Sequence, residues 1–336
     1  MKNYYQLTDL ASKLTILRHE GNQKGLDTGF ASLKDFVTLK KGYPLFIAGS
    51  PGAGKSEFTM ELLLNCSILY GWKHFIYAGE GGNPEDVFAD LVSKYIEKPF
   101  ISNGNHFAMT ESEKTRGEMF INDHFVIANS DIEFTIKEFL KAVNDCENDL
   151  GIQFDTTTFD PFNDVKEEMA EHGNREDKYL ASVLKAIRIS SKVNKRIDIF
   201  VNHIADVKAL LDKDSNTRYI PPALPSEWSG GRTWWRRAFT MLLIYRPSVN
   251  VKSENGTPHE ANEMHVYIQK IKPKGVGKLG ICRLFWDWQK NRYYSWIEGQ
   301  KVYSCQTFTK EYLQPATEMK PLNPSLSFND NLDAPF

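Results

Sequence analysis

One eight-residue segment constrains the possible folds of this chain more than any other feature. Residues 49–56 read GSPGAGKS, which fits the pattern GxxxxGK[ST] at every fixed position. Glycines at this spacing let backbone N–H groups curl around phosphate oxygens. We therefore expect a phosphate-binding loop at Gly49, Ser50, Pro51, Gly52, Ala53, Gly54, Lys55 and Ser56. The next residue, Glu57, should also contact the nucleotide.

The surroundings of this segment are those that a nucleotide-binding loop requires. Residues 44–48 (PLFIA) predict a buried strand before it, and residues 56–70 predict a helix after it. A helix that begins at this point adds the positive end of its dipole to the phosphate site. The Lys55 ammonium would then reach the outer phosphates of a nucleoside triphosphate, and the Ser56 hydroxyl would bind Mg²⁺. The segment thus predicts ATP and Mg²⁺ as cofactors.

The rest of the chain alternates between short apolar runs and helical patterns. Strands are predicted at residues 44–48, 74–78, 124–128, 156–160, 197–201, 241–245, 265–271 and 281–286, and helices at 56–70, 84–95, 132–146 and 177–194. Helices between strands imply parallel crossovers, so the predicted fold class is α/β, with a mostly parallel central sheet flanked by helices. A glycine-rich turn at residues 275–280 joins the last two predicted strands and indicates an antiparallel extension at one edge.

Three polar residues follow predicted strands at the end where the phosphate site lies. Asp160 ends the strand at residues 156–160, Glu80 follows the strand at 74–78, and His203 follows the strand at 197–201. The carboxyl ends of parallel strands meet at one edge of a sheet. We therefore expect Asp160 to hold Mg²⁺ together with Ser56, Glu80 to polarise the attacking water, and His203 to bind the γ-phosphate. The alternative for each is a solvated carboxylate or a structural histidine.

Length and composition narrow the class of protein. The 336 residues suit one domain, which we place at residues 25–300. A formal charge of -2 and a pI near 6.5 argue against nucleic-acid binding through overall charge, so any such contact needs a local basic patch. The four cysteines lie far apart without a CxxC pair, and no apolar run reaches the roughly 20 residues of a membrane span. We expect a cytoplasmic protein, in the host cytoplasm if a phage encodes it, without a membrane partner.

The two ends of the chain differ from the central domain. In residues 1–24, four leucines spaced by three and four positions form one stripe of an expected short helix, at Leu7, Leu10, Leu14 and Leu17. That stripe packs either on its own domain or on a neighbouring subunit, and the pattern does not decide between them. Residues 301–336 are polar and contain several prolines, so we expect a flexible tail.

A series of segments follows in order along the chain: GLDTGF, GSPGAGKSEF, GWKHFIYAGE, YIEKPF, DPFNDV, NHIAD, SGGRTWWRRAFTMLLIYRP and KIKPKGVGKLG. Together they resemble the ring-forming replicative DNA helicases of the RecA-like type. Within that family the chain looks like the Twinkle-like and phage primase-helicase branch, with DnaB as a more distant relative. The resemblance covers about residues 25–295 and includes no primase module, so we expect priming to be carried out elsewhere.

The resemblance implies a RecA-like P-loop NTPase fold and a hexameric helicase that translocates on single-stranded DNA. It makes Glu80 the catalytic base, Asp160 the metal carboxylate and His203 the γ-phosphate sensor. Arg246 and Trp286 would sandwich the adenine. The ATP would lie between subunits, where Lys270 and Lys272 of one chain reach the neighbour's site. Two alternatives stay open: a RecA-like recombination or loading ATPase that binds DNA without unwinding it, and a nucleotide-gated binding module that does not hydrolyse ATP.

One departure from the family pattern concerns the arginine finger. Lys272 stands where that pattern has an arginine, and an ammonium cannot reproduce the bidentate contacts of a guanidinium. We therefore expect either slower hydrolysis or a substitute contact from Lys274 or Arg237.

Two stretches without a predicted element, residues 163–176 and 205–232, fall where this family has its DNA-binding loops. The second stretch and its exit combine cations with tryptophans, a composition that suits backbone neutralisation and base stacking. We predict DNA contacts there and expect Trp234 and Trp235 to pack in the core instead. The alternative is a solvated charged face. The predicted DNA-binding residues are Lys208, Lys213, Arg218 and Arg232.

The last seven residues, DNLDAPF, look like the acidic, Phe-terminated tails that recruit partners to replication complexes. A terminal carboxylate and ring suit a basic pocket with an apolar floor. The possible partners are a polymerase, a primase or a single-strand-binding protein, and the alternative is a solvated tail.

Overall fold

A ten-stranded sheet forms the centre of the molecule, in the order β12-β11-β10-β9-β8-β1-β5-β4-β2-β3. The structure is a computed structural model that describes residues 4–104, 106–165, 169–213, 215–253 and 256–305. The strands from β8 to β3 run parallel, whereas β9 to β12 continue the sheet in antiparallel pairs. The predicted fold class, with its antiparallel edge extension, is confirmed.

The elements have the following bounds. The strands are β1 Leu45–Gly49, β2 His74–Ala78, β3 Phe125–Ile127, β4 Thr156–Asp160, β5 Ile197–His203, β6 Leu210–Asp212, β7 Thr217–Tyr219, β8 Thr240–Tyr245, β9 Glu263–Lys270, β10 Gly280–Asp287, β11 Arg292–Ile297 and β12 Gln300–Tyr303. The α-helices are α1 Ala11–Glu20, α2 Lys55–Tyr70, α3 Pro84–Ile96, α4 Glu111–His124, α5 Ile136–Leu150, α6 Glu176–Asn194 and α7 Arg232–Arg237. Short 3-10 turns lie at η1 Leu7–Leu10, η2 Ala31–Leu33, η3 Phe162–Asp164, η4 Met169–His172 and η5 Pro225–Glu227.

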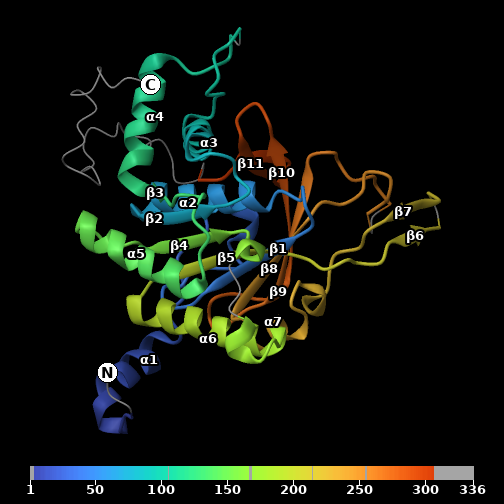
Figure 1. Cartoon of the computed structure of the whole chain (residues 1–336). Helices are drawn as coiled ribbons and strands as arrows, with labels where there is room; N and C mark the ends of the chain where they lie inside the picture. Colours follow the sequence, from blue (N-terminus) through green and yellow to red (C-terminus); the bar gives the residue numbers. More distant parts are fainter. Residues whose placement is uncertain (1–3, 105, 166–168, 214, 254–255, 306–336) are drawn as a thin grey trace.

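Helices cover both faces of the sheet and enclose two apolar cores. On one face lie α2, α3 and α4, and on the other lie α5, α6 and α7 (Figure 1). The first core contains Phe58 of α2, Leu91 of α3 and Phe120 of α4, all fully buried. The second contains Phe139 of α5, Ile187 of α6 and the α7 residue Trp234. The β1 residues alternate between the two cores, as a strand buried on both faces requires.

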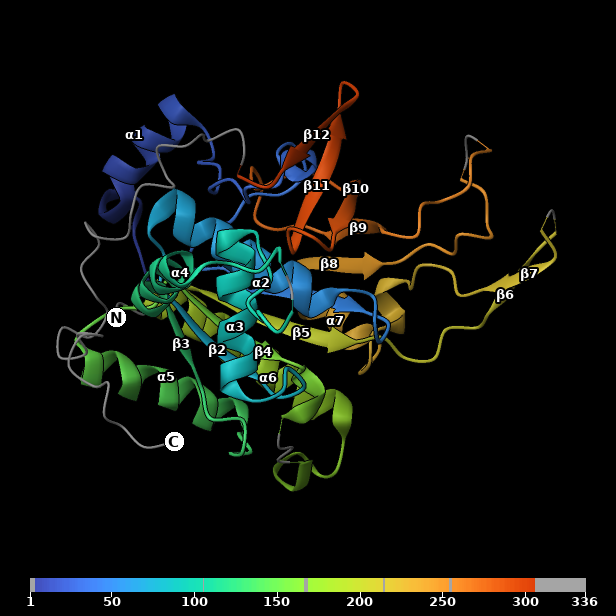
Figure 2. The same ribbon diagram turned by 90° about the horizontal axis from the view of Figure 1, so that it is seen from above.

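Most predicted elements agree with the structure. The exceptions are one helix around residue 115 and several elements in the second half of the chain. Helices α4 and α7 and the strands β11 and β12 were not predicted. The prediction that residues 205–232 lack secondary structure is wrong, because β6 and β7 form an antiparallel hairpin there. This hairpin projects away from the main sheet (Figures 1 and 2). Its strands are only three residues long and mostly exposed, so they lack the apolar run that marks a buried strand.

The ends of the described chain bear on the predicted domain limits. Helix α1 buries none of its residues, and Leu7, Leu14 and Leu17 are 74%, 41% and 46% exposed. At the other end, β12 pairs with β11, so the sheet continues past residue 300. The predicted partner-binding tail at residues 330–336 lies outside the described residues. None of the helices in the described ranges combines the length and apolar character that a membrane crossing requires.

Candidate functional site

The order of the central strands brings the predicted phosphate-site residues to one edge of the sheet. In the parallel pair β1 and β5, Gly49 lies opposite His203, and in the pair β2 and β4, Ala78 lies opposite Asp160. Because β5 and β4 are neighbours, the ends of β1, β5, β4 and β2 follow one another. The P-loop, His203, Asp160 and Glu80 therefore meet at adjacent strand ends, which is the arrangement that the sequence predicts.

The loop between β1 and α2 takes its shape from its glycines. Gly54 has a φ of +91°, which favours glycine, and a Cβ there would lie 2.8 Å from the Tyr293 hydroxyl. A Cβ on Gly49 would lie 2.4 Å from the Ile244 carbonyl oxygen. The Lys55 ammonium donates to the Ser50 carbonyl at 3.1 Å, across the loop. Substitution at either glycine would push the loop away from the strands that position it.

Polar contacts link the side chains at these strand ends. The Lys55 Nζ lies 3.3 Å from His203 Nδ1, and His203 Nε2 lies 3.4 Å from Glu80 Oε1. The Ser56 hydroxyl donates to Asp160 Oδ2 at 2.7 Å. The backbone N–H of His203 donates to the Asn163 side-chain oxygen at 3.1 Å. Five of the predicted site residues thus form two connected groups. Lys55, His203 and Glu80 form one, and Ser56 and Asp160 form the other.

Burial and neighbouring charges perturb the ionisable groups of Lys55 and Asp160, both of which are buried. Desolvation lowers the pKa of the Lys55 ammonium, although Asp160 and Glu80 oppose this shift. Desolvation also raises the pKa of the Asp160 carboxyl, against the hydrogen bond from Ser56 and the charge of Lys55. An added cation beside Asp160 would favour its ionised form. The Ser56 hydroxyl and the Asp160 carboxylate are oxygen donors of the kind that Mg²⁺ prefers, so the side chains fit this ion.

A cavity of about 360 Å³ opens beside the loop. Its polar wall includes Lys55, Ser56, Glu80 and His203, and its apolar wall includes Trp286. The complete lining is Pro51, Gly52, Ala53, Gly54, Lys55, Ser56, Glu57, Glu80, His203, Arg246, Asn262, Glu263, Met264, Trp286 and Tyr293. The cavity thus has a polar region suited to phosphates and an aromatic region suited to a base.

Several contacts fix the aromatic region. The Trp286 and Tyr293 rings pack edge to face, with centroids 4.8 Å apart. The fully buried Lys94 places its Nζ 4.5 Å from the Trp286 ring centroid and pairs with Glu57. The Arg246 guanidinium donates to the Ala261 carbonyl at 3.0 Å. Glu57, Arg246 and Trp286 therefore line one cavity with the P-loop, as predicted.

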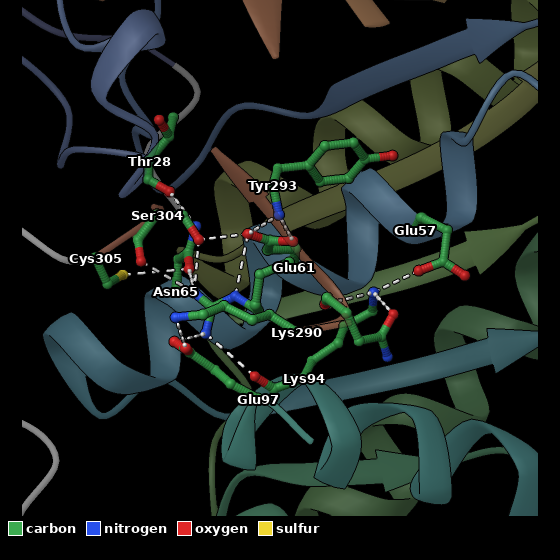
Figure 3. A network of polar contacts seen from close by, with 12 residues as sticks. Thr28, Glu57, Glu61, Asn65, Lys94, Glu97, Lys290, Tyr293, Ser304 and Cys305 are labelled. Carbon is green, nitrogen blue, oxygen red and sulfur yellow. Dashed lines mark hydrogen bonds and ion pairs between the residues drawn. The ribbon is translucent and has the colours of Figure 1, made fainter. Parts of the chain in front are cut away.

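A buried ion pair joins the antiparallel extension to the P-loop helix. The Arg292 guanidinium of β11 donates to Glu61 Oε1 of α2 at 3.1 Å and to Asn65 Oδ1 at 3.2 Å. Glu61 also accepts the Tyr293 backbone N–H at 2.9 Å. Figure 3 shows Glu61, Asn65 and Ser304 pointing toward one another in this network. Since Tyr293 lines the cavity, the network holds the aromatic wall in register with the P-loop helix.

The structure does not bring every predicted site residue to this cavity. Gly49 and Ser50 contribute none of the lining, and Lys270 and Lys272 also lie elsewhere. Asp160 does not line the cavity either, but it accepts a hydrogen bond from Ser56, which does. The Lys270 ammonium donates to the Trp235 carbonyl and lies 5.4 Å from the centre of the Trp235 ring. Desolvation and the nearby Lys272 lower the pKa of Lys270 to about 8. Lys272 is exposed.

The predicted DNA-binding residues cluster on and beside the projecting hairpin. Lys208, Lys213 and Arg218 are exposed there, and the exposed Arg232 begins α7. Trp234 is fully buried, as expected, but the expectation for Trp235 is wrong, because 47% of it is exposed. The short α7 turns the two adjacent tryptophans in different directions, and only one reaches the core.

Sequence reasoning missed several residues around the cavity, among them Tyr293, Lys94 and Asn163. Tyr293 lies on β11, a strand that was not predicted, and Lys94 reaches the site from the last turn of α3. Asn163 follows the predicted strand that ends at Asp160, so its place after a strand end was the one available signal. The other two depend on contacts between segments about 200 residues apart.

The fold and the site define a RecA-like P-loop domain. No protein-family model matches the chain. It is 23% identical over 275 residues to the Twinkle homolog protein, chloroplastic/mitochondrial, of Arabidopsis thaliana. That match covers 80% of this chain and 36% of the relative, so the chain corresponds to about a third of that protein.

Two solved structures share the fold. One is described as a DnaB-like replicative helicase and its interactions with primase, with a TM-score of 0.66, 14% identity, and coverage of 87% of this chain and 68% of that chain. The other is described as an ATPase domain, with a TM-score of 0.67, 12% identity, and coverage of 87% of this chain and 99% of that chain. The sequence match to the Twinkle homolog and the fold shared with these two structures together confirm the resemblance drawn from the sequence.

Proposed function

We propose that this chain is the motor of a ring-shaped replicative DNA helicase that hydrolyses ATP at subunit interfaces and translocates on single-stranded DNA. The observation that carries the proposal is the connected set Lys55–His203–Glu80, which lies beside the Ser56–Asp160 pair at one cavity. A triphosphate needs a cation for its outer phosphates, a base for the attacking water, and a sensor of the γ-phosphate. This set contains one candidate for each role.

In the proposed mechanism, each residue has a separate task. Lys55 binds the outer phosphates, and Ser56 with Asp160 would hold Mg²⁺, which supplies charge neutralisation of the phosphoryl oxygens when bound. Glu80 accepts a proton from the attacking water, and its 63% exposed side chain leaves room for that water. His203 contacts both Lys55 and Glu80, so loss of the γ-phosphate would change its hydrogen bonds. The chain segment after His203 leads to the hairpin.

The base of ATP would occupy the aromatic wall. Trp286 offers its ring to the cavity, and Arg246 is the cation predicted to lie on the other face of the adenine. Tyr293 and Asn262 complete this wall. The 360 Å³ cavity is partly open, as expected if a second subunit contributes to the closed site.

Oligomerisation would use the surfaces that the single chain leaves uncovered. The exposed leucine stripe of residues 7–17 would dock on a neighbouring subunit, because α1 buries no residue against its own domain. Lys270 and Lys272 would then reach the neighbour's phosphates, with Lys272 in place of an arginine finger. We propose a hexamer, with residues 1–24 as its linker and the domain that begins at residue 25 and includes β12 as its motor. The residues after that domain would recruit replication proteins in the cytoplasm.

Single-stranded DNA would contact the projecting hairpin. Lys208, Lys213 and Arg218 present exposed cations there, and Arg232 lies at the start of α7. Arg218→Ala should weaken binding to single-stranded DNA equally for all sequences. It should also reduce the slope of log affinity against log salt concentration by about one. Arg188→Ala, an exposed arginine on α6, is the matched control and should leave both unchanged.

The decisive experiment compares Glu80→Gln with the control Glu85→Gln, which changes an exposed glutamate at the start of α3. We expect phosphate release stimulated by single-stranded DNA to fall about 10²- to 10⁴-fold in Glu80→Gln, with nucleotide binding retained. The parent and the control should displace a strand from a forked duplex. Stimulated hydrolysis without strand displacement would favour a recombination or loading ATPase, and no hydrolysis in the parent would refute the motor.

A further inference from the structure

A second cluster of chemically capable side chains lies beside the nucleotide cavity, and one of its residues, Glu263, lines that cavity. His259, Glu263 and His265 each offer one ligand atom, and these atoms all lie within 4.8 Å of one another. The exposed fractions of the three side chains are only 10%, 5% and 8%. The proposed ATPase mechanism uses none of the three.

The backbone explains why these residues converge. Glu263 and His265 are the first and third residues of β9, so their side chains share one face of the strand. His259 lies in the connection that leads from β8 to β9. His259 Nδ1 is 3.0 Å from Glu263 Oε2, and His265 Nε2 is 2.7 Å from Glu263 Oε1. Both imidazole rings therefore direct a nitrogen at the same carboxylate.

We propose that His259, Glu263 and His265 form a zinc site, with a water as the fourth ligand. Two imidazole nitrogens and one carboxylate are a donor set that binds zinc tetrahedrally with one open position. The set suits zinc better than Mg²⁺ or Ca²⁺, which prefer oxygen ligands. This proposal is independent of ATP hydrolysis, because none of its ligands has a role in the chemistry at Lys55 and Glu80.

The protonation states of the cluster suit metal binding. Desolvation lowers the pKa of His265, which keeps its imidazole neutral at neutral pH. Burial opposes ionisation of Glu263, but hydrogen bonds from His265 and His259 outweigh it and hold the pKa of that carboxyl below its usual value. A neutral imidazole and an ionised carboxylate are the forms that ligate a metal.

One neighbouring cation opposes the metal. The Arg283 Nε lies 3.7 Å from Glu263 Oε1, but half of the Arg283 side chain is exposed, so it can turn toward solvent. The rings of Tyr245 and Tyr267 also lie beside His265. The charge of Arg283 should therefore weaken zinc binding without blocking the three ligand atoms.

Zinc at this site would order one wall of the nucleotide cavity. Glu263 lines the cavity, and the residue before it, Asn262, donates to the Trp286 carbonyl oxygen at 2.9 Å. The bridge from His259 to Glu263 would fix the segment that carries Ala261, the partner of Arg246. The metal would thus act as a structural support for the proposed base-binding wall, and it would take no part in catalysis.

The test uses the full chain without a histidine tag. After treatment with a chelator and dialysis, the protein is titrated with ZnCl₂ in excess Mg²⁺, and bound zinc is measured by mass spectrometry. We expect about one zinc per chain in the parent. His259→Asn and Glu263→Gln should each weaken zinc binding at least about 100-fold, because each removes a ligand. His106→Asn, an exposed histidine outside the cluster, should retain the parent's zinc.

Two further measurements sharpen the result. Arg283→Gln should bind zinc about three- to tenfold more tightly, because it removes the opposing charge. Co²⁺ added to the parent should give the visible absorption bands of a four- or five-coordinate site, and His259→Asn should lack them. Circular dichroism identifies any variant that fails to fold. Absence of zinc from the parent, or the same zinc affinity in a folded His259→Asn, would overturn the proposal and leave a hydrogen-bonded His–Glu–His group.

Discussion

The parallel and antiparallel halves of the sheet contribute differently to the cavity. In the parallel half, from β8 to β3, the strands end at or lead into polar residues. Asp160 and His203 end β4 and β5, Glu80 follows β2, and Lys55 begins the helix after β1. The antiparallel half, from β9 to β12, contributes the aromatic residues Trp286 and Tyr293. In the parallel half, charged side chains such as Lys55 and Glu80 line the cavity. The ion pair that joins the antiparallel half to α2, between Arg292 and Glu61, is buried instead. The comparison suggests that phosphate chemistry belongs to one half and placement of the base to the other.

Lys55→Ala tests the parallel half and should have the largest effect. The ammonium would neutralise charge that develops on the phosphoryl group, so its loss should reduce ATP hydrolysis about 10²- to 10³-fold or more. Phosphate release under saturating ATP is the measurement. Lys34→Ala, which changes an exposed lysine outside the cavity lining, is the control and should keep the parent rate. Equal turnover in Lys55→Ala and the parent would remove the phosphate role from this half.

Arg292→Met tests whether the antiparallel half is tied to the P-loop helix by the buried ion pair. Removal of the guanidinium leaves Glu61 uncompensated and fully buried, which should lower the free energy of unfolding by about 3–5 kcal/mol. Urea unfolding measures this change. The double variant Glu61→Met/Arg292→Met should recover part of the loss, because no buried charge remains. A cost below about 1 kcal/mol for the single variant would show that the two halves are joined by packing alone.

The acid response of the parallel half depends on a buried histidine in β2. His74 is fully buried between Thr156 Oγ1, at 2.7 Å, and Ser67 Oγ, at 3.0 Å, and desolvation lowers its pKa well below 6.5. The unfolded chain therefore binds a proton that the folded chain does not, once the pH falls below about 6.5. Stability that is present above this pH should be lost on acidification, by up to about 1.4 kcal/mol per pH unit.

His74→Gln separates this histidine from the others. Glutamine keeps polar groups near both hydroxyls but does not titrate, so the slope of stability against pH between about 6.5 and 5.5 should decrease. Chemical unfolding at a series of pH values measures both slopes. His124 and His265 also have pKa values lowered by burial, so some slope should remain. Parallel curves for the variant and the parent would assign the acid sensitivity elsewhere.

The two halves also differ in how well the sequence predicts them. In the parallel half, short apolar runs mark the strands, and residues such as Asp160 mark the strand ends. The P-loop pattern marks the turn between β1 and α2. The strand β2 was predicted to the residue. In the antiparallel half, β11 begins with four buried residues, with Tyr293 and Tyr294 between Arg292 and Ser295. The Arg292 guanidinium is paired with residues on α2 and after β12. Those partners lie far away in the sequence, so no local pattern marks Arg292 as a core residue.

The hairpin β6–β7 and the cluster at Glu263 were missed for related reasons. Each hairpin strand is too short to show periodicity, and none of its residues is buried. His259, Glu263 and His265 have no motif of known spacing, and their approach depends on the path of a connection that the sequence does not define. Conversely, Lys55 was found through the P-loop pattern, and Asp160 and His203 were found because each lies at the end of a predicted strand.

Trp286→Ala tests the antiparallel half and should have the smallest effect of the four. The ring packs against Tyr293 on one side of the cavity and against the Lys94 ammonium, so its loss removes a stacking surface for the base. Nucleotide affinity should fall by about 1 kcal/mol, or roughly fivefold, while the rate at saturating ATP stays close to that of the parent. Titration with a fluorescent ATP analogue and steady-state kinetics together give this split between KM and kcat.

Trp288→Ala, which changes an exposed tryptophan two residues further on, is the matched control. If Trp286→Ala instead lowers kcat and leaves affinity unchanged, the aromatic wall acts on the phosphate chemistry, and the two halves do not divide the work as proposed.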